Sequence, residues 1–304
     1  MGMLAMKQSS TRSDTISVVV PVYGPGPHLE NVIAALQKQS PPVGDIVISH
    51  SGECDPSVRF AGVPGVTVLH SPQRLYAGAA RNRGLAYVKT EWVAFVDEDI
   101  IVGENWHAAL QAATTRGDAE CISGSIDFAE PGGYWGMSVW YVEFGSVHPY
   151  LARGPIISGP SANIVIQKAL LESIGGFPED WLRCQDTVAQ MRLREAGGRI
   201  AFDPSLVGFH MNVPGLQRML RHMYISGRYG AMARRAYPKW PGGMAVRVPI
   251  FSLGLWLARI VQTYNRAIRS RNARFMSLVK HTPGILIGLI AWNAGFTREA
   301  FRKS

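Results

Sequence analysis

The first hydrophobic block of the chain, TISVVVPVY (15–23), predicts a buried strand. It is an almost continuous β-branched run that ends at the loop GPGP, which is typical of a strand covered on both faces. The next block, HLENVIAALQKQ (28–39), spaces its apolar residues for one face of a helix and stops at SPP. A strand followed by an amphipathic helix is therefore expected at the start of the chain.

The same alternation continues as far as residue 96. DIVISH (45–50), VTVLH (66–70) and WVAFV (92–96) predict three more strands, and GAARNRGLAYV (78–88) predicts a helix between the last two. This order favours an α/β fold with an open, mostly parallel sheet, helices on both faces and right-handed connections. In such sheets, ligands bind beyond the carboxyl ends of the strands.

Three carboxylates stand at such a strand end, because Asp97, Glu98 and Asp99 directly follow the run at 92–96. Clustered acids raise one another's pKa unless a cation lies close to them. Mg²⁺ or Mn²⁺ would satisfy that need, and phosphates commonly fill the remaining coordination positions. An acidic turn that only solvates the strand end is the alternative, and the tripeptide alone does not decide between them.

Composition indicates a folded protein. The chain has 304 residues, of which 47% are hydrophobic, so it can build one large domain or two modest ones and does not belong to the disordered class. Its three cysteines lie far apart without a CxxC pair, which predicts reduced thiols of a cytoplasmic protein and no zinc site. Residues 1–14 have too short an apolar stretch for a signal peptide and are expected to be a disordered tail.

Charge divides the chain at about residue 210. Residues 1–210 hold 15 Lys and Arg against 21 Asp and Glu, whereas residues 211–304 hold 16 against the single acid Glu299. Two apolar segments in the basic part, at 246–262 and 283–296, flank the arginine-rich RAIRSRNARF, and neither uncharged run reaches the roughly 20 residues that span a bilayer. These features predict helices that lie in the membrane interface, with the basic residues facing anionic headgroups.

The basic region allows two other interpretations. Nucleic acid also attracts arginine-rich surfaces, but it would leave the long aliphatic runs uncovered, so no nucleic-acid partner is expected. A dimerisation arm, with apolar helices buried against a second copy, stays open and makes a homo-oligomer possible. The preferred interpretation is a protein on the cytoplasmic face of a membrane.

Motifs through residue 210 resemble those of the inverting family-2 glycosyltransferases, which have the GT-A fold. SVVVPVYG, DIVISHSGECD, AGAARNRG and WVAFVDEDI follow in the family's order, and GPSANIVIQKALLESIGGFPE and CQDTVAQMRLREAGGRIAFDPSLVGFH continue it. The resemblance implies a catalytic domain over 15–210 with a Rossmann-like, open mixed sheet and helices on both faces. Residues 211–304 would then be a basic, amphipathic helical extension that associates with membrane.

The resemblance also implies a donor site for a nucleotide-diphospho-sugar. Tyr23 would stack on the base, and Arg81 would clamp the nucleotide or the first carboxylate with its planar guanidinium. Asp99 would hold Mn²⁺ or Mg²⁺ together with Asp97 and His210. Glu98 is secondary, because an extended chain points it to the opposite side. The residues assigned to the nucleotide sugar are Pro21, Val22, Tyr23, Ser51, Arg81, Asp97 and Glu98.

On the acceptor side, the resemblance makes Asp186 the catalytic base that takes the proton of an acceptor hydroxyl, in a single displacement that inverts the sugar. Asp186 precedes the helical stretch TVAQMRLREAG, where a helix N-terminus stabilises a carboxylate, although a helix cap would explain the same position. Asn163, Trp181 and Gln185 are expected to contact the acceptor, which would be a glycan or a lipid-linked sugar at the membrane.

Two positions depart from the family pattern. Gln185 replaces the Glu of the usual Glu-Asp pair, and His50-Ser51 stands where many members have two aspartates that recognise the base. A non-catalytic binding or scaffold protein with the same fold therefore stays open. A nucleotidyltransferase is a further alternative, but it would be expected to carry a lysine in the loop GPGPHLE, which has none.

Overall fold

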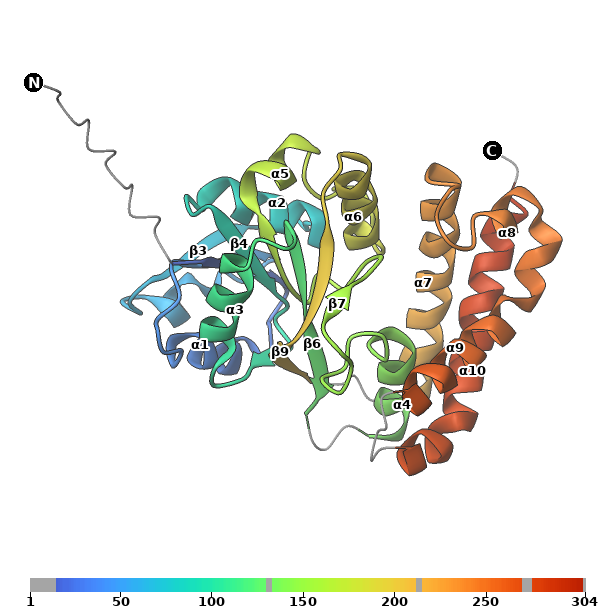
Figure 1. Ribbon diagram of the computed structural model, residues 1–304. Helices are drawn as coiled ribbons and strands as arrows, with labels where there is room; N and C mark the ends of the chain where they lie inside the picture. The colour runs from blue at the N-terminus through green and yellow to red at the C-terminus, as the bar shows by residue number, and fades with distance from the viewer. Residues whose placement is uncertain (1–14, 130–132, 212–214, 270–274, 303–304) are drawn as a thin grey trace, which may run out of the picture.

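A computed structural model describes residues 15–129, 133–211, 215–269 and 275–302. The predicted N-terminal tail, residues 1–14, lies outside the described residues. The described chain forms a sheet domain, residues 15–210, with helices on both faces of its sheet and a layer of C-terminal helices beside it (Figure 1).

The sheet is mixed, as the resemblance implied. In the described residues its order is β3-β2-β1-β4-β8-β6-β9-β5, with β7 paired to β9. Strands β1 to β4 are mutually parallel, whereas β8 runs antiparallel to both β4 and β6. The strands are β1 Ser17–Tyr23, β2 Ile46–Ser51, β3 Val66–Ser71, β4 Trp92–Val96, β5 Ile100–Val102, β6 Cys121–Phe128, β7 Gly154–Pro155, β8 Asn163–Gln167 and β9 Ile200–His210.

The first strand is buried on both faces, as its β-branched run predicted. Val18 and Val20 pack into the core on one side of the sheet and Val19 into the core on the other, all without exposed surface. Helices α1 (Leu29–Gln37) and α3 (Trp106–Thr115) cover the first side. Helices α2 (Ala77–Tyr87), α5 (Lys168–Ser173) and α6 (Gln185–Glu195) cover the second (Figure 1).

The basic C-terminal region folds into helices that pack against the sheet domain. They are α7 (Leu216–Ala236), α8 (Met244–Arg247), the 3-10 helix η2 (Pro249–Gly254), α9 (Leu255–Arg269) and α10 (Phe275–Ala300), and α4 (Tyr134–Glu143) joins them from the sheet domain. Gly227 and Gly295 let α7 and α10 approach closely, because a Cβ at either would collide with the backbone of the other helix. Their core is continuous with the core on the α1 and α3 side of the sheet.

Helix α10 changes one expectation. The sequence analysis counted only the uncharged run at 283–296, whereas the helix continues past charged residues on both sides to a length of 26 residues. By length and composition, this helix is long enough to cross a membrane. However, 39% of its most apolar window is buried inside the protein, where it packs on α7, α4 and α9. Glu299, near its end, is 3% exposed and pairs with Arg228 and Arg235 of α7. The only acid after residue 210 therefore holds two helices together.

Candidate active site

The three clustered acids diverge toward three different partners. Asp97 Oδ1 accepts a hydrogen bond from Arg81 Nη2 of α2 at 2.5 Å. Glu98 extends toward Gly26 in the loop after β1, on the other side of the chain. Asp99 Oδ2 lies 3.4 Å from His210 Nε2, because β5 pairs antiparallel with β9 and brings the two residues together.

Burial and the neighbouring charges both act on the acids of this corner. Burial, reinforced by the charges of Asp99 and Asp97, raises the pKa of Glu98 to about 8. Burial also raises the pKa of Asp97, although the Arg81 guanidinium acts in the opposite direction. The acids of this cluster therefore raise one another's pKa, as the sequence argument assumed, with burial as the larger cause.

Asp99 and His210 are the two side chains of this corner that could hold a metal ion. A carboxylate oxygen and an imidazole nitrogen suit Mn²⁺, and a carboxylate also suits Mg²⁺. In the described part of the chain, no three His, Cys, Asp or Glu side chains converge, so a diphosphate and water would have to complete the coordination. Arg81 fits such a ligand, because its buried Nε and Nη1 have no hydrogen-bond acceptor among the described residues.

A cavity of about 440 Å³ opens beside these groups and is lined by Asp97, Asp99 and His210. Its rim carries Arg74, whose guanidinium lies 4.5 Å from the centre of the Tyr23 ring. Tyr23 itself is 52% exposed, so its ring is available next to the cavity. The sequence analysis missed Arg74, and its position shortly before the AGAARNRG motif was the only signal.

The other residues assigned to the nucleotide contribute little side-chain surface. Val22 is a core residue, and Pro21 is buried in the same strand. Ser51 is fully buried, and its hydroxyl faces the Leu75 carbonyl at 3.5 Å. His50, also buried, makes contacts to His70 Nδ1 at 3.0 Å and to the Gly24 carbonyl at 2.8 Å. These positions shape the end of the sheet, whereas Tyr23 and Arg74 present accessible groups.

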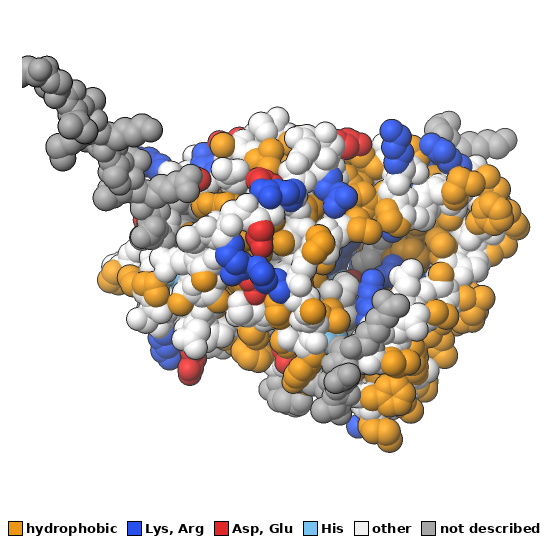
Figure 2. All heavy atoms as spheres, in the orientation of Figure 1, with side chains coloured by type: hydrophobic (Ala, Val, Ile, Leu, Met, Phe, Trp, Pro, Cys, Tyr) orange, Lys and Arg blue, Asp and Glu red, His pale blue; other side chains and the backbone are white. Residues whose placement is uncertain are grey.

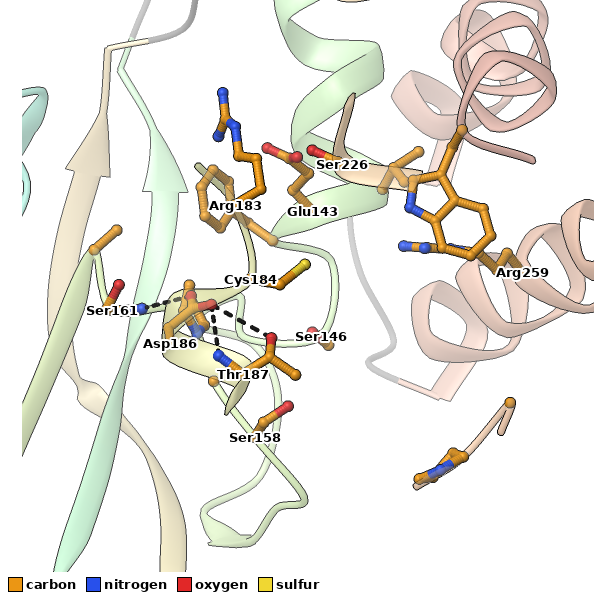
Figure 3. Close-up of a pocket in the computed structure, with 18 of the residues that line it drawn as sticks. Glu143, Ser146, Ser158, Ser161, Arg183, Cys184, Asp186, Thr187, Ser226 and Arg259 are labelled. Atoms are coloured by element: carbon orange, nitrogen blue, oxygen red, sulfur yellow. Dashed lines mark hydrogen bonds between the residues drawn. The ribbon is translucent and has the colours of Figure 1, made fainter. Parts of the chain in front are cut away.

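A second cavity, of about 660 Å³, lies between the sheet domain and the C-terminal helices and contains Asp186 on its wall. Figure 2 shows the surface hollowed between these two parts of the molecule. Asp186 accepts hydrogen bonds from the backbone N–H groups of Ser161 at 3.2 Å and Thr187 at 2.7 Å (Figure 3). These bonds fix the carboxylate in one orientation.

Asp186 does not precede its helix or cap it. Helix α6 begins at Gln185, which places Asp186 in the first turn, and the cap is Cys184 in the left-handed conformation with φ 60°. A non-glycine residue in that conformation is uncommon, so the residue type gave no sign of this helix start. The helix begins two residues before the expected stretch, which started at Thr187. The carboxylate still lies at the helix N-terminus, where the helix dipole stabilises negative charge.

The three predicted acceptor residues have different positions. Gln185 lines the Asp186 cavity, and its Oε1 is buried without a partner among the described residues. Asn163 is fully buried and uses its amide on Trp106 Nε1 and on the Ser125 and Leu206 carbonyls, so it belongs to the scaffold. Trp181 packs beside Tyr229 and is absent from the described lining of both cavities.

The two cavities share one wall, formed by Asp97, Glu143, Phe144, Ala162 and Arg183. Within it, Arg183 Nη2 donates to His222 Nδ1 at 2.7 Å, and His222 Nε2 donates to Glu143 at 2.6 Å. Burial opposes the charge of Glu143, yet His222, Arg183 and His210 hold its pKa at about 2. His222 of α7 thus ties the C-terminal helices to the loop before Asp186, a link that the sequence did not reveal.

Comparisons with known proteins agree with this architecture. The model of the family described as "Glycosyl transferase family 2" matches residues 17–174, just over half of the chain. The pre-mycofactocin glycosyltransferase of Mycobacterium tuberculosis is 26% identical over 258 residues. That match covers 81% of this chain but only 54% of the relative, so the chain spans about half the relative's length.

Further matches extend the comparison. The N-acetylglucosaminyl-diphospho-decaprenol L-rhamnosyltransferase of M. tuberculosis is 21% identical, covering 65% of this chain and 76% of that protein. The solved structure of mannosyltransferase PcManGT from Pyrobaculum calidifontis, in complex with GDP-Man and Mn²⁺, aligns with a TM-score of 0.59 at 16% identity, covering 92% and 86%. S. aureus TarS 1–349 gives 0.55 at 15% identity, covering 93% and 90%. The structural likenesses establish the GT-A fold.

Proposed function

Since the chain belongs to glycosyl transferase family 2, we propose that it is a metal-dependent, inverting glycosyltransferase acting on a nucleotide-diphospho-sugar. One observation carries this proposal: the cavity that holds Asp99 and His210 and the cavity that holds Asp186 share a wall at Asp97. A donor in the first and an acceptor in the second would meet at that wall. The fold alone, without paired cavities, would not require transfer between two substrates.

The donor side fits a sugar diphosphate. Asp99 and His210 would hold Mn²⁺ or Mg²⁺, which neutralises negative charge as it builds on the leaving diphosphate. Arg81 has two unpaired donors beside Asp97, and Tyr23 offers a ring next to the cavity. The solved neighbours lend support, because PcManGT is in complex with GDP-Man and Mn²⁺ and TarS has been solved with UDP-GlcNAc.

The acceptor side fits a general base. The Ser161 and Thr187 backbone N–H groups hold the Asp186 carboxylate on the cavity wall, where it would take the proton from an acceptor hydroxyl. Attack from this cavity, opposite the departing diphosphate, would invert the anomeric carbon. Asp186 is therefore the proposed catalytic base, and Gln185 is proposed to contact the acceptor.

We place the acceptor at a membrane surface. Helices α9 and α10 expose apolar side chains that include Leu257, Val261 and Ile290, each more than half exposed. Such a surface beside many arginines suits the interface of an anionic bilayer, on the cytoplasmic face. The name of the related rhamnosyltransferase identifies a diphospho-decaprenol substrate, which supports a lipid-linked acceptor here.

The test is metal-dependent hydrolysis of a panel of nucleotide sugars by the native chain, since water can replace the acceptor. Asp186→Asn should slow turnover by about 10²–10⁴-fold, because it removes the base. Asp99→Asn should abolish the response to Mn²⁺. Asp180→Asn, at an exposed acid of the same segment, is the matched control and should turn over normally.

Two outcomes would contradict the proposal. If neither the native chain nor Asp186→Asn hydrolyses any nucleotide sugar with Mn²⁺, the non-catalytic scaffold would be favoured. A product that keeps the donor's anomeric configuration in NMR spectra would exclude the inverting mechanism.

A further inference from the structure

Helix α9 packs one apolar side, which includes Ile260, on the protein core and presents two further sides. Its face toward the Asp186 cavity carries Arg259, Gln262 and Arg266. Its outer face exposes Leu257 and Val261, at 51% and 57%. Figure 2 shows hydrophobic side chains along the outer edge of these helices. Because a surface helix usually turns its charged residues to solvent, the arginines that α9 turns toward the cavity are the feature that needs an explanation.

The two inward arginines have no carboxylate partner in the described part of the chain. Arg259 stacks on the Trp292 ring at 4.2 Å, and neither Arg259 nor Arg266 forms an ion pair there. Burial, with the nearby charges of Arg234 and Arg266, lowers the pKa of Arg259 to about 10. Three guanidinium groups, of Arg234, Arg259 and Arg266, therefore lie near one another in the partly buried cavity. Their mutual repulsion is unfavourable unless an anion binds between them.

Glu143 on the shared wall acts on Arg259 through its charge, but its hydrogen bond among the described residues goes to His222. On the opposite wall, the Gln185 amide is 8% exposed, and its Oε1 has no partner among the described residues. Figure 3 shows Arg259 across the cavity from Asp186. The cavity therefore has a base at one end and unpaired guanidinium groups at the other.

We propose that Arg259 and Arg266 bind a phosphate or diphosphate group of the acceptor, which would be a phosphorylated lipid. The acceptor hydroxyl would then lie at Asp186, and the hydrocarbon would leave along the apolar outer face of α9. Guanidinium groups pair with phosphate oxygens through two parallel hydrogen bonds, which gives orientation as well as affinity. The role as acceptor rests on the proposed function, whereas the anion site rests on the cavity alone.

The test titrates the full chain, with EDTA present, with inorganic pyrophosphate and with geranyl diphosphate in a calorimeter. Arg259→Gln/Arg266→Gln should weaken both by about tenfold or more, because two charged hydrogen-bond donors are lost. The matched control, Arg247→Gln/Lys280→Gln, removes two exposed positive charges from the same helical region and should change affinity less than about twofold. Equal affinity in all three proteins would overturn the proposal.

Single variants keep the test decisive if the double variant fails to fold. Arg266 forms no hydrogen bond with the described residues, so Arg266→Gln should leave the fold intact while lowering affinity, and Arg266→Lys should retain more of it. Unaltered pyrophosphate affinity in a folded Arg266→Gln would count against the site.

Vesicles separate an acceptor phosphate from a membrane headgroup. On phosphatidylglycerol and phosphatidylcholine vesicles, Arg259→Gln/Arg266→Gln should float like its charge-matched control. Loss of flotation with retained pyrophosphate affinity would mean that these arginines contact headgroups, which overturns the assignment. Failure of the proposed function is a separate result: it appears as absent donor hydrolysis in the native chain, while the pyrophosphate titration still decides the anion site.

Discussion

At the scale of single residues, the type of a side chain was easier to predict than its direction. The sequence showed that Asp97, Glu98 and Asp99 form an acidic cluster, but each direction depends on a partner from elsewhere in the chain. Arg81 donates a hydrogen bond to Asp97, His210 lies beside Asp99, and Glu98 extends toward Gly26. Asn163 shows the limit of such reasoning, since a polar residue beside a site motif can instead satisfy buried carbonyls.

Replacing Glu98 should change how stability depends on pH. The folded state binds the Glu98 proton up to about pH 8, whereas the unfolded chain releases it near its ordinary pKa of 4.5. Glu98 therefore stabilises the fold below that ordinary pKa and loses this contribution as the pH rises toward 8. In EDTA at pH 8, Glu98→Gln should be more stable than the native chain by about 1–3 kcal/mol, as measured by urea denaturation.

The two urea midpoints should converge below pH 4.5, where Glu98 is protonated in both the folded and the unfolded chain. Glu104→Gln, at an exposed acid nearby, should follow the native chain at every pH. Parallel curves for Glu98→Gln and the native chain would show that Glu98 is not held in its protonated form.

At the scale of elements, the strands and helices were predicted to within two residues, and at α6 that small difference matters for the site. Strand β4 lies at 92–96 as expected, because its apolar run has no competing interpretation. Helix α6 begins earlier than predicted, because Cys184 adopts a left-handed conformation that its residue type does not signal. This difference moves Asp186 into the first helical turn.

The packing of α7 on α10 should depend on Glu299. Its carboxylate accepts from Arg228 Nη2 at 3.2 Å and lies 3.5 Å from Arg235 Nη1, with only 3% of the residue exposed. Glu299→Gln should lower the free energy of unfolding by about 1–3 kcal/mol, because two arginines lose a charged acceptor. Chemical denaturation measures the change, with Glu195→Gln, an exposed helix acid, as the control that should stay within about 0.5 kcal/mol.

An unaltered unfolding energy in Glu299→Gln would mean that the glycine contacts and apolar packing hold α7 and α10 without this ion pair.

At the scale of the whole molecule, the catalytic domain was predictable and the arrangement of the basic region was not. The strand and helix pattern of residues 15–210 specified a known architecture, which the comparisons confirm. The helices after residue 210 were expected from their apolar and basic segments, but sequence could not show that α9 turns its arginines inward. Which face of an amphipathic helix points to the protein depends on its neighbours.

The outward apolar face should decide membrane association. Leu257→Glu/Val261→Glu places two charges on the outer side of α9 and should reduce co-sedimentation with phosphatidylglycerol vesicles by about tenfold or more, because apolar burial is replaced by charged groups. Val58→Glu, at an 86% exposed apolar residue of the catalytic domain, is the control and should bind vesicles normally. Donor hydrolysis should persist in both variants.

The dimer interpretation makes the opposite prediction. If the native chain sediments as a dimer in lipid-free buffer, and Leu257→Glu/Val261→Glu makes it a monomer without changing vesicle binding, the apolar face is an interface between copies.

The wall common to the two cavities has a kinetic consequence. In the proposed function, a donor in one cavity and an acceptor in the other would both contact the shared wall of Asp97, Glu143 and Arg183. Saturation by one reactant would therefore depend on the concentration of its companion, and initial-rate plots would give intersecting lines. The binding of each substrate would then depend on the other through the wall that the two cavities share.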